Sequence, residues 1–298
     1  MPQASRTITE GGIFLEPPEK EGRLGLALKI DKVLLHKKTK YQELHVVESG
    51  PLGRVLLLDG AIQLTTWDEP AYHEMMAHVP LLSHPDPKRV LIIGGGDGGA
   101  LREVLRHPGV EQCDLCEIDG EVIQAAKQFM PQVASAFDHP KARVRVGDGL
   151  SFIKDAQTTY DVILVDSSDP EGPALGLFGP QFYSDAYRAL KPGGMVVSQA
   201  ESCNFYGPML KDMFGFMKGL FPLTLFYLVM VPTYIGGSIG FALNSLGPDP
   251  MTGPHPGHLA KLGDLKYYTP ALHRAAFALP AHYAEFLTPE MTQRQIGQ

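Results

Sequence analysis

Two carboxylates stand three residues apart at the end of an apolar run. The run covers residues 162–165, and Asp166 and Asp169 follow it before Pro170 and Gly172, which continue the chain as a loop. Ligands of open α/β sheets bind at the carboxyl ends of the strands. Two acids at such a place suit a cationic substrate, or a base that takes a proton from one. For the pair alone, a turn cap and an Asx-turn before Pro170 remain the structural alternative.

A glycine-rich segment upstream indicates what these acids work beside. Gly94 to Gly99 follows a predicted strand and opens a predicted helix, the context in which a Rossmann-type loop approaches its ligand. Glu117 lies 23 residues after Gly94 at the end of the next predicted strand, where an acid bonds ribose hydroxyls. Asp97 argues against a pyrophosphate, because its carboxylate would occupy the anion site at the helix N-terminus. It suits a cationic ligand, such as an adenosyl sulfonium that carries an amino group.

A third strand end adds an acid that suits adenine. Gly147, Asp148 and Gly149 follow the predicted strand 143–146. A carboxylate at this point can accept a hydrogen bond from the exocyclic amine of the base. Asp148 also has the position of an N-cap for a predicted helix over 149–154, so capping and ligand binding both stay open.

Composition and charge narrow the class of protein. The chain has 298 residues, 44% of them hydrophobic and 20% charged, which is ordinary for a globular protein. A formal net charge of −7 without a basic cluster makes a nucleic-acid partner unexpected. The first residues lack an apolar signal core, and the longest apolar stretch, 220–231, is interrupted and too short to span a bilayer. We therefore expect a cytoplasmic protein without a membrane partner.

The cysteines favour a reducing compartment and a structural role. Three of them, Cys113, Cys116 and Cys203, cannot form a disulfide framework. The first two make a C-x-x-C, but they lie inside a predicted strand, where positions three apart face opposite ways. The chain has no second pair that would complete a zinc site. We therefore expect these thiols to be buried.

The chain divides into two predicted parts. Residues 1–67 indicate a small β-rich domain, with a hairpin over 54–64 that turns at Asp59-Gly60. Residues 68–298 form the second part, which alternates between strands and helices from Lys88 and therefore predicts a mainly parallel sheet covered on both faces. The turn over 191–194, Lys-Pro-Gly-Gly, is typical of Rossmann-like folds of the nucleoside-binding methyltransferase type. The fold class is therefore α/β.

Individual elements follow from periodicity and from glycine and proline positions. A helix is predicted to begin at Asp68, Glu69 and Pro70 and to end at Pro80, and the tail is expected to be helical around 270–288. The predicted strands are 89–93, 112–118, 143–146, 160–165, 194–200, 223–231 and 237–243. The other predicted helices are 98–107, 120–130, 149–154, 180–190 and 205–219. The aromatic residues assigned to the core are Phe14, Phe205, Tyr206, Phe214, Phe216, Phe221 and Phe226.

The order of the motifs resembles the spermidine synthase family, the polyamine aminopropyltransferases. The resemblance covers roughly residues 20–290, nearly the whole chain. The matching segments are 41–44, 57–63, 68–75, 94–99, 117–119, 147–149, 166–170, 199–202 and 232–234. This resemblance implies a β-rich N-terminal domain, a Rossmann-like catalytic domain and decarboxylated S-adenosylmethionine as the aminopropyl donor.

The resemblance also implies roles for residues of a donor site. Asp97 would hold the aminopropyl nitrogen of the donor, Glu117 the ribose hydroxyls and Asp148 the adenine amine. The residues that would complete this site are Gln42, His73 and Gly149. Without the resemblance, His73 would be interpreted as a packed histidine.

The acceptor site follows in the same way. Asp166 would be the catalytic base, and Asp169 would bind the distal ammonium of the acceptor amine. The remaining substrate-site residues would be Gln63, Tyr72, Gln199 and Tyr234. One departure concerns the loop after Tyr234, where Ile235-Gly236-Gly237 replaces the Pro-Ser-Gly that is frequent in the family. The missing proline is expected to loosen this loop, which bears on acceptor preference.

We therefore expect an enzyme that transfers an aminopropyl group to putrescine, giving spermidine and methylthioadenosine. A base is needed because an alkylamine titrates near ~10 and is protonated at neutral pH. The alternatives are another acceptor (agmatine, cadaverine or spermidine), a putrescine N-methyltransferase, and an inactive amine-binding protein. Methyl transfer is less expected, because Asp97 would repel the carboxylate of S-adenosylmethionine.

The expected partners are the diamine and further copies of the same chain. The resemblance implies a homodimer or a homotetramer, and the sequence does not choose between them. No cofactor is expected beyond the co-substrate. No metal site is expected either, because the sequence has no histidine and carboxylate cluster at ligand spacing.

Overall fold

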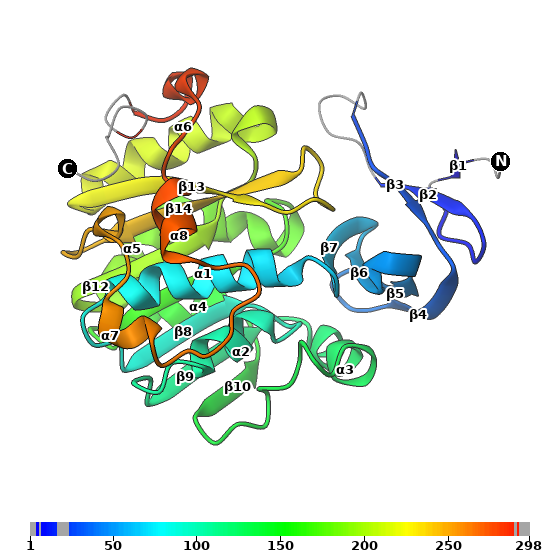
Figure 1. Ribbon diagram of the computed structural model, residues 1–298, viewed down its shortest axis with the longest axis horizontal. Helices are drawn as coiled ribbons and strands as arrows, with labels where there is room; N and C mark the ends of the chain where they lie inside the picture. Colours follow the sequence, from blue (N-terminus) through cyan, green and yellow to red (C-terminus); the bar gives the residue numbers. More distant parts are fainter. Residues whose placement is uncertain (1–3, 6, 17–23, 289–290, 292–298) are drawn as a thin grey trace.

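A seven-stranded sheet forms the centre of the computed structural model, which describes residues 4–5, 7–16, 24–288 and 291 (Figure 1). Its strands are β8 (Arg89–Gly94), β9 (Gln112–Glu117), β10 (Ala142–Val146), β11 (Tyr160–Asp166), β12 (Leu190–Gln199), β13 (Leu223–Met230) and β14 (Ser238–Ser245). They lie in the order β10-β9-β8-β11-β12-β14-β13. The pairs from β10 to β12 are parallel, and β14 is antiparallel to β12 and β13. The predicted mainly parallel α/β sheet is confirmed.

Helices cover both faces of this sheet. The helices are α1 (Glu69–Ser83), α2 (Gly99–Leu105), α3 (Gly120–Phe129), α4 (Gly149–Lys154), α5 (Pro180–Ala189), α6 (Cys203–Leu220), α7 (Pro256–Leu259) and α8 (Pro270–Ala275). One buried cluster joins the sheet to α1, α2 and α3, and a second joins it to α4, α5 and α6. Residues 90–93 of β8 and 162–165 of β11 are all buried, as expected for strands covered on both sides.

Two small sheets form the N-terminal part. One contains β4 (Lys32–Lys38), β5 (Glu43–Glu48), β6 (Arg54–Leu58) and β7 (Ala61–Thr65), and the other contains β1 (Ala4–Ser5), β2 (Ile13–Leu15) and β3 (Ala27–Lys29). The predicted hairpin is confirmed between β6 and β7. Asp59 and Gly60 turn it with φ angles of 49° and 86°, as a primed turn requires.

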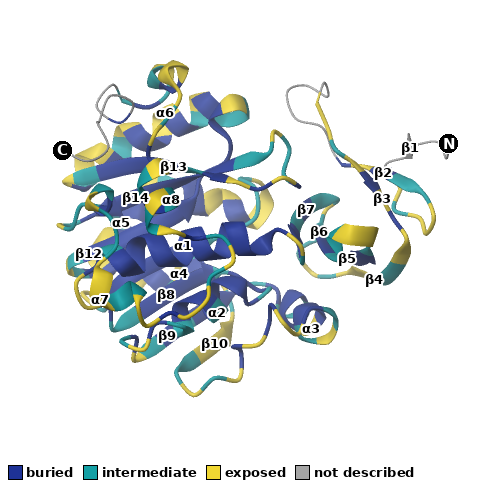
Figure 2. Cartoon of the chain, in the orientation of Figure 1, coloured by how far each residue is buried: buried dark blue, intermediate teal, exposed yellow. Residues whose placement is uncertain are grey.

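Helix α1 connects the two parts and lies almost entirely out of solvent (Figure 2). It begins at Glu69 after Asp68, as predicted, but the predicted end at Pro80 is wrong. Pro80 lies inside the helix, which continues to Ser83. Val79, Leu81 and Leu82 around the proline are fully buried, so tertiary packing outweighs the hydrogen bond that proline cannot donate.

The C-terminal segment differs most from expectation. Instead of one helix over 270–288, the structure has α8 and then a 3₁₀ turn over Ala281–Glu285. Pro280 lies between them, and proline disfavours helical backbone in the residue before it. The other 3₁₀ turns are Gly50–Leu52, Gly172–Phe178 and Pro250–Thr252. In the ranges that the structure describes, no helix is long and apolar enough to cross a membrane.

Glu74 of α1 fastens this C-terminal segment to the core. Its two carboxylate oxygens accept the backbone N–H groups of Lys266, Tyr267 and Tyr268 at 2.8, 2.9 and 2.8 Å. Glu74 is itself only 1% exposed. A buried carboxylate needs such donors, because its water has been removed. The helix and the segment therefore stabilise one another.

We expect Glu74→Ala to lower the free energy of unfolding by about 3 kcal/mol or more, since it leaves three backbone donors without an acceptor. Urea denaturation followed by circular dichroism measures this change. Glu285→Ala is the matched control, because Glu285 is exposed and surface substitutions stay within about 0.5 kcal/mol. Equal midpoints for the two variants would show that Glu74 does not hold the segment.

Candidate active site

The carboxyl ends of β8 and β11 bring the glycine loop and the acidic loop together. The two strands are neighbours, and their register pairs Gly94 with Asp166. Gly94 and Gly95 have φ angles of 80° and 69°, in the left-handed region that glycine adopts without strain. A Cβ atom on Gly94 would overlap the carbonyl oxygen of Asp166. The close approach of the two loops therefore requires glycine at this position.

A cleft opens where these loops face the N-terminal sheet. The structure brings together in its lining every residue that was predicted from the sequence for the donor and acceptor sites. These residues are Gln42, Gln63, Tyr72, His73, Asp97, Glu117, Asp148, Gly149, Asp166, Asp169, Gln199 and Tyr234. Their roles stay predictions at this point.

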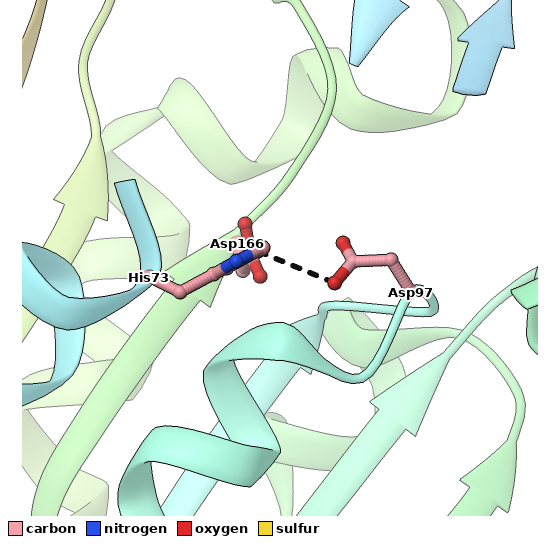
Figure 3. Close-up of side chains that lie close together, drawn as sticks. All are labelled: His73, Asp97 and Asp166. Atoms are coloured by element: carbon pink, nitrogen blue, oxygen red, sulfur yellow. Dashed lines mark ion pairs between the residues drawn. The ribbon is translucent and has the colours of Figure 1, made fainter. Parts of the chain in front are cut away.

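His73 lies close to Asp97 and Asp166, and it forms an ion pair with Asp97 (Figure 3). Its Nε2 is 3.2 Å from Oδ1 of Asp97, and its Nδ1 is 2.6 Å from Oε2 of Glu69 one turn earlier in α1. Burial opposes protonation of the ring, but Asp97 and Glu69 outweigh it and raise the pKa of His73 well above its usual value. These contacts favour the protonated ring over a neutral packed histidine.

Asp97 occupies the N-terminal end of α2. Its Oδ1 accepts the backbone N–H of Gly99 at 2.6 Å. Burial raises the pKa of Asp97, but the charge of His73 outweighs that effect, so the pKa lies below its usual value. An ionised carboxylate already fills the place where a phosphate would bind, as the sequence indicated.

Asp166 has the opposite electrostatic environment. Burial and the negative charge of Asp97 raise the pKa of Asp166 to about 7, although His73 and a hydrogen bond with Tyr72 lower it in part. Its Oδ2 is buried and has no hydrogen-bond partner among the described residues. A carboxylate with a free oxygen and a pKa near neutrality is suited to accept a proton.

Two tyrosines border the cleft beside Asp166. The ring centroids of Tyr72 and Tyr234 are 6.2 Å apart. The Tyr234 hydroxyl donates to the carbonyl oxygen of Gln63 at 2.5 Å. Asp68 holds the preceding residue, because its Oδ2 accepts the N–H and the hydroxyl of Thr233 at 3.0 and 2.8 Å. These bonds fasten the loop that was expected to be loose without its proline.

The far side of the cleft carries a strained acid and an unpaired amide oxygen. Nε2 of Gln199 donates to Oε1 of Glu201 at 2.5 Å. The buried Oε1 of Gln199 has no partner among the described residues. Glu201 has a φ angle of 60°, a conformation that costs free energy in a non-glycine residue and is typical of functional sites. The amide oxygen is therefore free to accept a bond from a ligand.

The other arm of the cleft contains Glu117 and Gln42. Burial is the main cause that raises the pKa of Glu117 to about 7. Oε1 of Glu117 accepts the N–H of Asp119 at 2.8 Å. Nε2 of Gln42 donates to Oδ2 of Asp119 at 3.0 Å. Asp119 therefore links the N-terminal sheet to the strand end that carries Glu117.

Asp148 serves as a helix cap and also lines the cleft. It accepts the N–H of Leu150 at 3.0 Å and the hydroxyl of Ser151 at 2.7 Å. The two interpretations left open by the sequence are therefore compatible in structure. Gly149 follows it, and a Cβ there would overlap Cγ2 of Ile93.

The reason given for expecting no metal site was wrong in its geometry. His73, Asp97 and Asp166 each offer one ligand atom, and these atoms lie within 4.8 Å of one another. The sequence concealed the cluster because its members come from α1 and from the ends of β8 and β11. A metal needs a lone pair on the imidazole, and both ring nitrogens of His73 face carboxylates. We therefore do not assign these residues as metal ligands.

Two residues assigned to the core line the cleft instead, Phe205 and Tyr206. Tyr206 breaks the helical geometry of α6 with φ −111° and ψ 19°, shortly before Pro208. This kink turns the first residues of α6 toward the ligand side, which helical periodicity could not reveal. Glu16, which follows β2, and Glu201 also line the cleft, although the sequence did not predict either of them as a site residue.

Two family models match the chain. The spermine/spermidine synthase domain matches residues 69–249, more than half of the chain. The spermidine synthase tetramerisation domain matches residues 17–66. The chain belongs to the spermine/spermidine synthase family. The predicted family is confirmed, and the N-terminal match supports self-association of this synthase-family chain.

Curated relatives and solved structures agree with this family. A polyamine aminopropyltransferase of Moorella thermoacetica is 45% identical over 264 residues, covering 89% of this chain and 93% of the relative. A spermidine synthase of Dictyostelium discoideum is 45% identical over 278 residues, 93% of this chain and 98% of the relative. The chain is therefore an enzyme of the aminopropyltransferase class.

The solved structures extend the agreement to the fold. A spermidine synthase in complex with the transition state analogue AdoDATO has a TM-score of 0.89 at 37% identity, covering 95% of this chain and 97% of that one. The spermidine synthase of Thermotoga maritima has a TM-score of 0.85 at 36% identity, covering 92% and 94%. Both support the Rossmann-like assignment.

We expect Gly99→Ala to reduce aminopropyltransferase activity at least ~10-fold, because the added Cβ would overlap the ring of His73 and overpacking displaces side chains. Initial rates at saturating substrates measure the loss. Gly215→Ala in α6 is the matched control, since no atom lies within 4 Å of a Cβ there. Full activity in the Gly99 variant would show that the position of His73 is unimportant.

Proposed function

We propose that the enzyme transfers the aminopropyl group of decarboxylated S-adenosylmethionine to putrescine, giving spermidine and methylthioadenosine, with Asp166 as the base. The observation that carries this proposal is the unpartnered, buried Oδ2 of Asp166 beside the ion pair of Asp97 and His73. Two acids and one cation leave net negative charge at this point of the cleft. Such a site attracts cations and can accept a proton from one of them.

The donor is proposed to lie along the ends of β8, β9 and β10. Asp97 is positioned for the aminopropyl nitrogen, Glu117 for the ribose hydroxyls and Asp148 for the adenine amine. The proposed residues around them are Gln42, His73 and Gly149. The ionised state of Asp97 supports this role, since a primary ammonium binds best to a charged acceptor.

The acceptor amine is proposed to lie on the other side of Asp166. Asp169 would bind the distal ammonium, and the free amide oxygen of Gln199 would accept a further N–H bond. Gln63, Tyr72 and Tyr234 would form the channel around the methylene groups. The contact between the two tyrosine rings supports an apolar channel of this kind.

The proposed reaction begins when Asp166 takes a proton from the nearer ammonium of the acceptor. The free amine then attacks the methylene carbon next to sulfur, forming a C–N bond as the C–S bond breaks. The bonding pair of the broken bond stays on sulfur, so methylthioadenosine leaves uncharged. Once the proton has passed from Asp166 to water, the carboxylate is ionised again. Positive charge develops on the attacking nitrogen, and this carboxylate stabilises that charge more in the transition state than before it.

The proposal extends to the domain division, the assembly and the location of the protein. The chain divides at residues 67 and 68 and acts as a homodimer or homotetramer, without a cofactor besides the donor. A cytoplasmic location is supported by Cys113, Cys116 and Cys203, which are buried free thiols.

The nearest alternative is the same reaction with a different acceptor amine. The loop after Tyr234 is the reason to retain this alternative. Ile235, in the place of the proline, lines the cleft, and Gly236, in the place of the serine, has a φ angle of 83° that favours glycine. The acceptor end is therefore built on different backbone from a Pro-Ser-Gly loop. Methyl transfer is disfavoured, because ionised Asp97 would repel the carboxylate of S-adenosylmethionine.

Mass-spectrometric product analysis tests the proposal. The enzyme is incubated with decarboxylated S-adenosylmethionine and putrescine, agmatine, cadaverine or spermidine, and in parallel with S-adenosylmethionine. We expect spermidine and methylthioadenosine from putrescine. Product only from another amine would replace the acceptor, and a methylated amine from S-adenosylmethionine alone would overturn the reaction.

We expect Asp166→Asn to lower kcat at least ~100-fold, the usual size of a general-base contribution, while donor affinity stays near that of the wild type. Rapid-quench assays and calorimetric titration of the donor measure the two quantities. Asp212→Asn on α6 is the control, because Asp212 is exposed. Undiminished turnover in the Asp166 variant would remove this residue as the base.

The pH profile follows from the pKa of Asp166, which is raised to about 7. The base acts only when ionised, so kcat/KM should fall as the pH drops through 7 and level off above it. Steady-state rates from pH 5.5 to 9 at constant ionic strength measure this limb. An acid limb near ~4, the ordinary aspartate value, would contradict the proposed environment.

A further inference from the structure

A buried chain of alternating charge leads away from the cleft. Asp97 faces Nε2 of His73, and Nδ1 of His73 faces Glu69. Arg102 of α2 holds Glu69 with two parallel bonds, 3.0 Å from Nη1 to Oε1 and 2.8 Å from Nη2 to Oε2. Its Nε donates to Oε1 of Glu103 at 2.7 Å. The signs along this chain therefore alternate from Asp97 to Glu103.

We propose that Arg102 and Glu69 are a positioning pair that holds His73 as an imidazolium against Asp97, and thereby favours the ionised forms of the two acids of the cleft. This proposal rests on the function proposed above, in which Asp97 binds the donor and Asp166 is the base. Neither Arg102 nor Glu69 lines the cleft. Glu69 acts through His73, and Arg102 acts through Glu69 and by its charge on Asp97.

The geometry leaves His73 one orientation. Glu69 lies four residues before His73 on α1, so the two side chains share one face of the helix. Gly99 closes the opposite side, because a Cβ there would overlap the ring. Glu69 cannot rotate away, since the guanidinium of Arg102 binds both of its oxygens in a planar fork. Arg102 is fixed in turn by Glu103.

Further side chains fix the guanidinium of Arg102 through their contacts with Glu103. Oε2 of Glu103 is 3.2 Å from Nε2 of His78 and 3.5 Å from Nε of Arg106. Nδ1 of His78 is 2.9 Å from Nε2 of His107. Glu103 and His78 are almost completely buried. The orientation of Arg102 is therefore set by packed groups rather than by solvent.

The same contacts determine the charge of Glu69 and the protonation of His73. Burial raises the pKa of Glu69, but His73 and Arg102 outweigh it and bring the pKa to about 2. Glu69 therefore stays charged at every pH at which the enzyme works. A permanently charged acid on Nδ1 favours the protonated ring, whose charge then faces Asp97. The charge of Arg102 also acts on Asp97 directly.

The charged and titratable groups around His73 come from three parts of the fold. Glu69 and Tyr72 belong to α1, Asp97 to the loop before α2, and Asp166 to the end of β11. Arg102 reaches the ring through Glu69. Removal of Arg102 takes one positive charge from this group, so protonation of Asp97 and Asp166 becomes easier. Loss of activity on acidification should then begin at higher pH.

The experiment compares pH profiles of kcat/KM for the wild type, Arg102→Gln, Arg102→Lys and Glu69→Gln. We expect the acid limb of Arg102→Gln and Glu69→Gln to move up by at least half a pH unit. The activity lost at pH 7, about 2-fold for a half-unit shift of a one-proton limb and more for a larger shift, should largely return at pH 9. Arg102→Lys should recover part of the shift, because it restores the charge without the fork.

Arg188→Gln is the matched control, because Arg188 on α5 is exposed and pairs with Asp185, away from Glu69, Glu103 and the cleft lining. Its acid limb should coincide with that of the wild type. An equal loss at every pH in Arg102→Gln and Glu69→Gln, or a limb that does not move, would overturn the positioning role. Glu69→Gln keeps the side-chain shape, so it tests the proposal even where Arg102→Gln fails to fold.

A spectroscopic readout separates this proposal from the proposed reaction. Long-range ¹H–¹⁵N spectra of histidine-labelled enzyme, with the His73 signals identified by their loss in His73→Asn, report the protonation of both ring nitrogens. We expect both to carry protons at pH 8 in the wild type, and the pKa of His73 to fall in Glu69→Gln. A neutral ring in the wild type at pH 8 would overturn the proposal. An enzyme inactive on all amines but with protonated His73 would overturn only the reaction.

Discussion

The structure depends on the burial of α1, a helix whose charged side chains have almost no access to water. Each charge that it carries into the interior needs a partner there, because an unpaired buried ion is costly. Glu69 pairs with Arg102, and Glu74 accepts hydrogen bonds from three backbone N–H groups of the C-terminal segment. Asp68, at the start of the helix, accepts a hydrogen bond from the hydroxyl of Thr233. The helix thereby ties together parts of the chain that are far apart in sequence.

The same constraint shapes the cleft. Asp97 and Asp166 lie close enough for each to influence the other, and only one of them has the His73 cation as a direct ion-pair partner. The result is two aspartates with opposite pKa shifts: the pKa of Asp97 is lowered, and that of Asp166 is raised to about 7. Chemically equivalent side chains acquire different tasks from their surroundings alone. The histidine is what makes them unequal.

The sequence predicted the parts of the fold and site that depend on local pattern. The apolar strands β8 and β11 and the loops after them were expected within a residue or two, and their parallel register then brings Gly94 beside Asp166. A capping role for Asp148 was also readable. The family resemblance, rather than spacing, singled out His73. All of these belong to strand ends, turns or motifs with a fixed order along the chain.

Features created by tertiary packing were not predictable. The link between Arg102 and Glu69 joins two helices 33 residues apart, and neither residue stands out by type or spacing. Pro80 looks like a helix end, yet the buried residues around it carry the helix onward. Tyr206 looks like a core aromatic, because periodicity assumes an unbroken helix and α6 is kinked there.

Trp67 is the single tryptophan of the chain and is 55% exposed. It lies at the junction of the N-terminal sheet and α1. Its backbone N–H donates at 3.3 Å to the hydroxyl of Thr65, which in turn donates to Asp68. The indole emission of this protein therefore originates at one place, the joint between its two parts. The enzyme carries its own optical label there, without any dye or engineered residue, and the signal is free of background from other indoles.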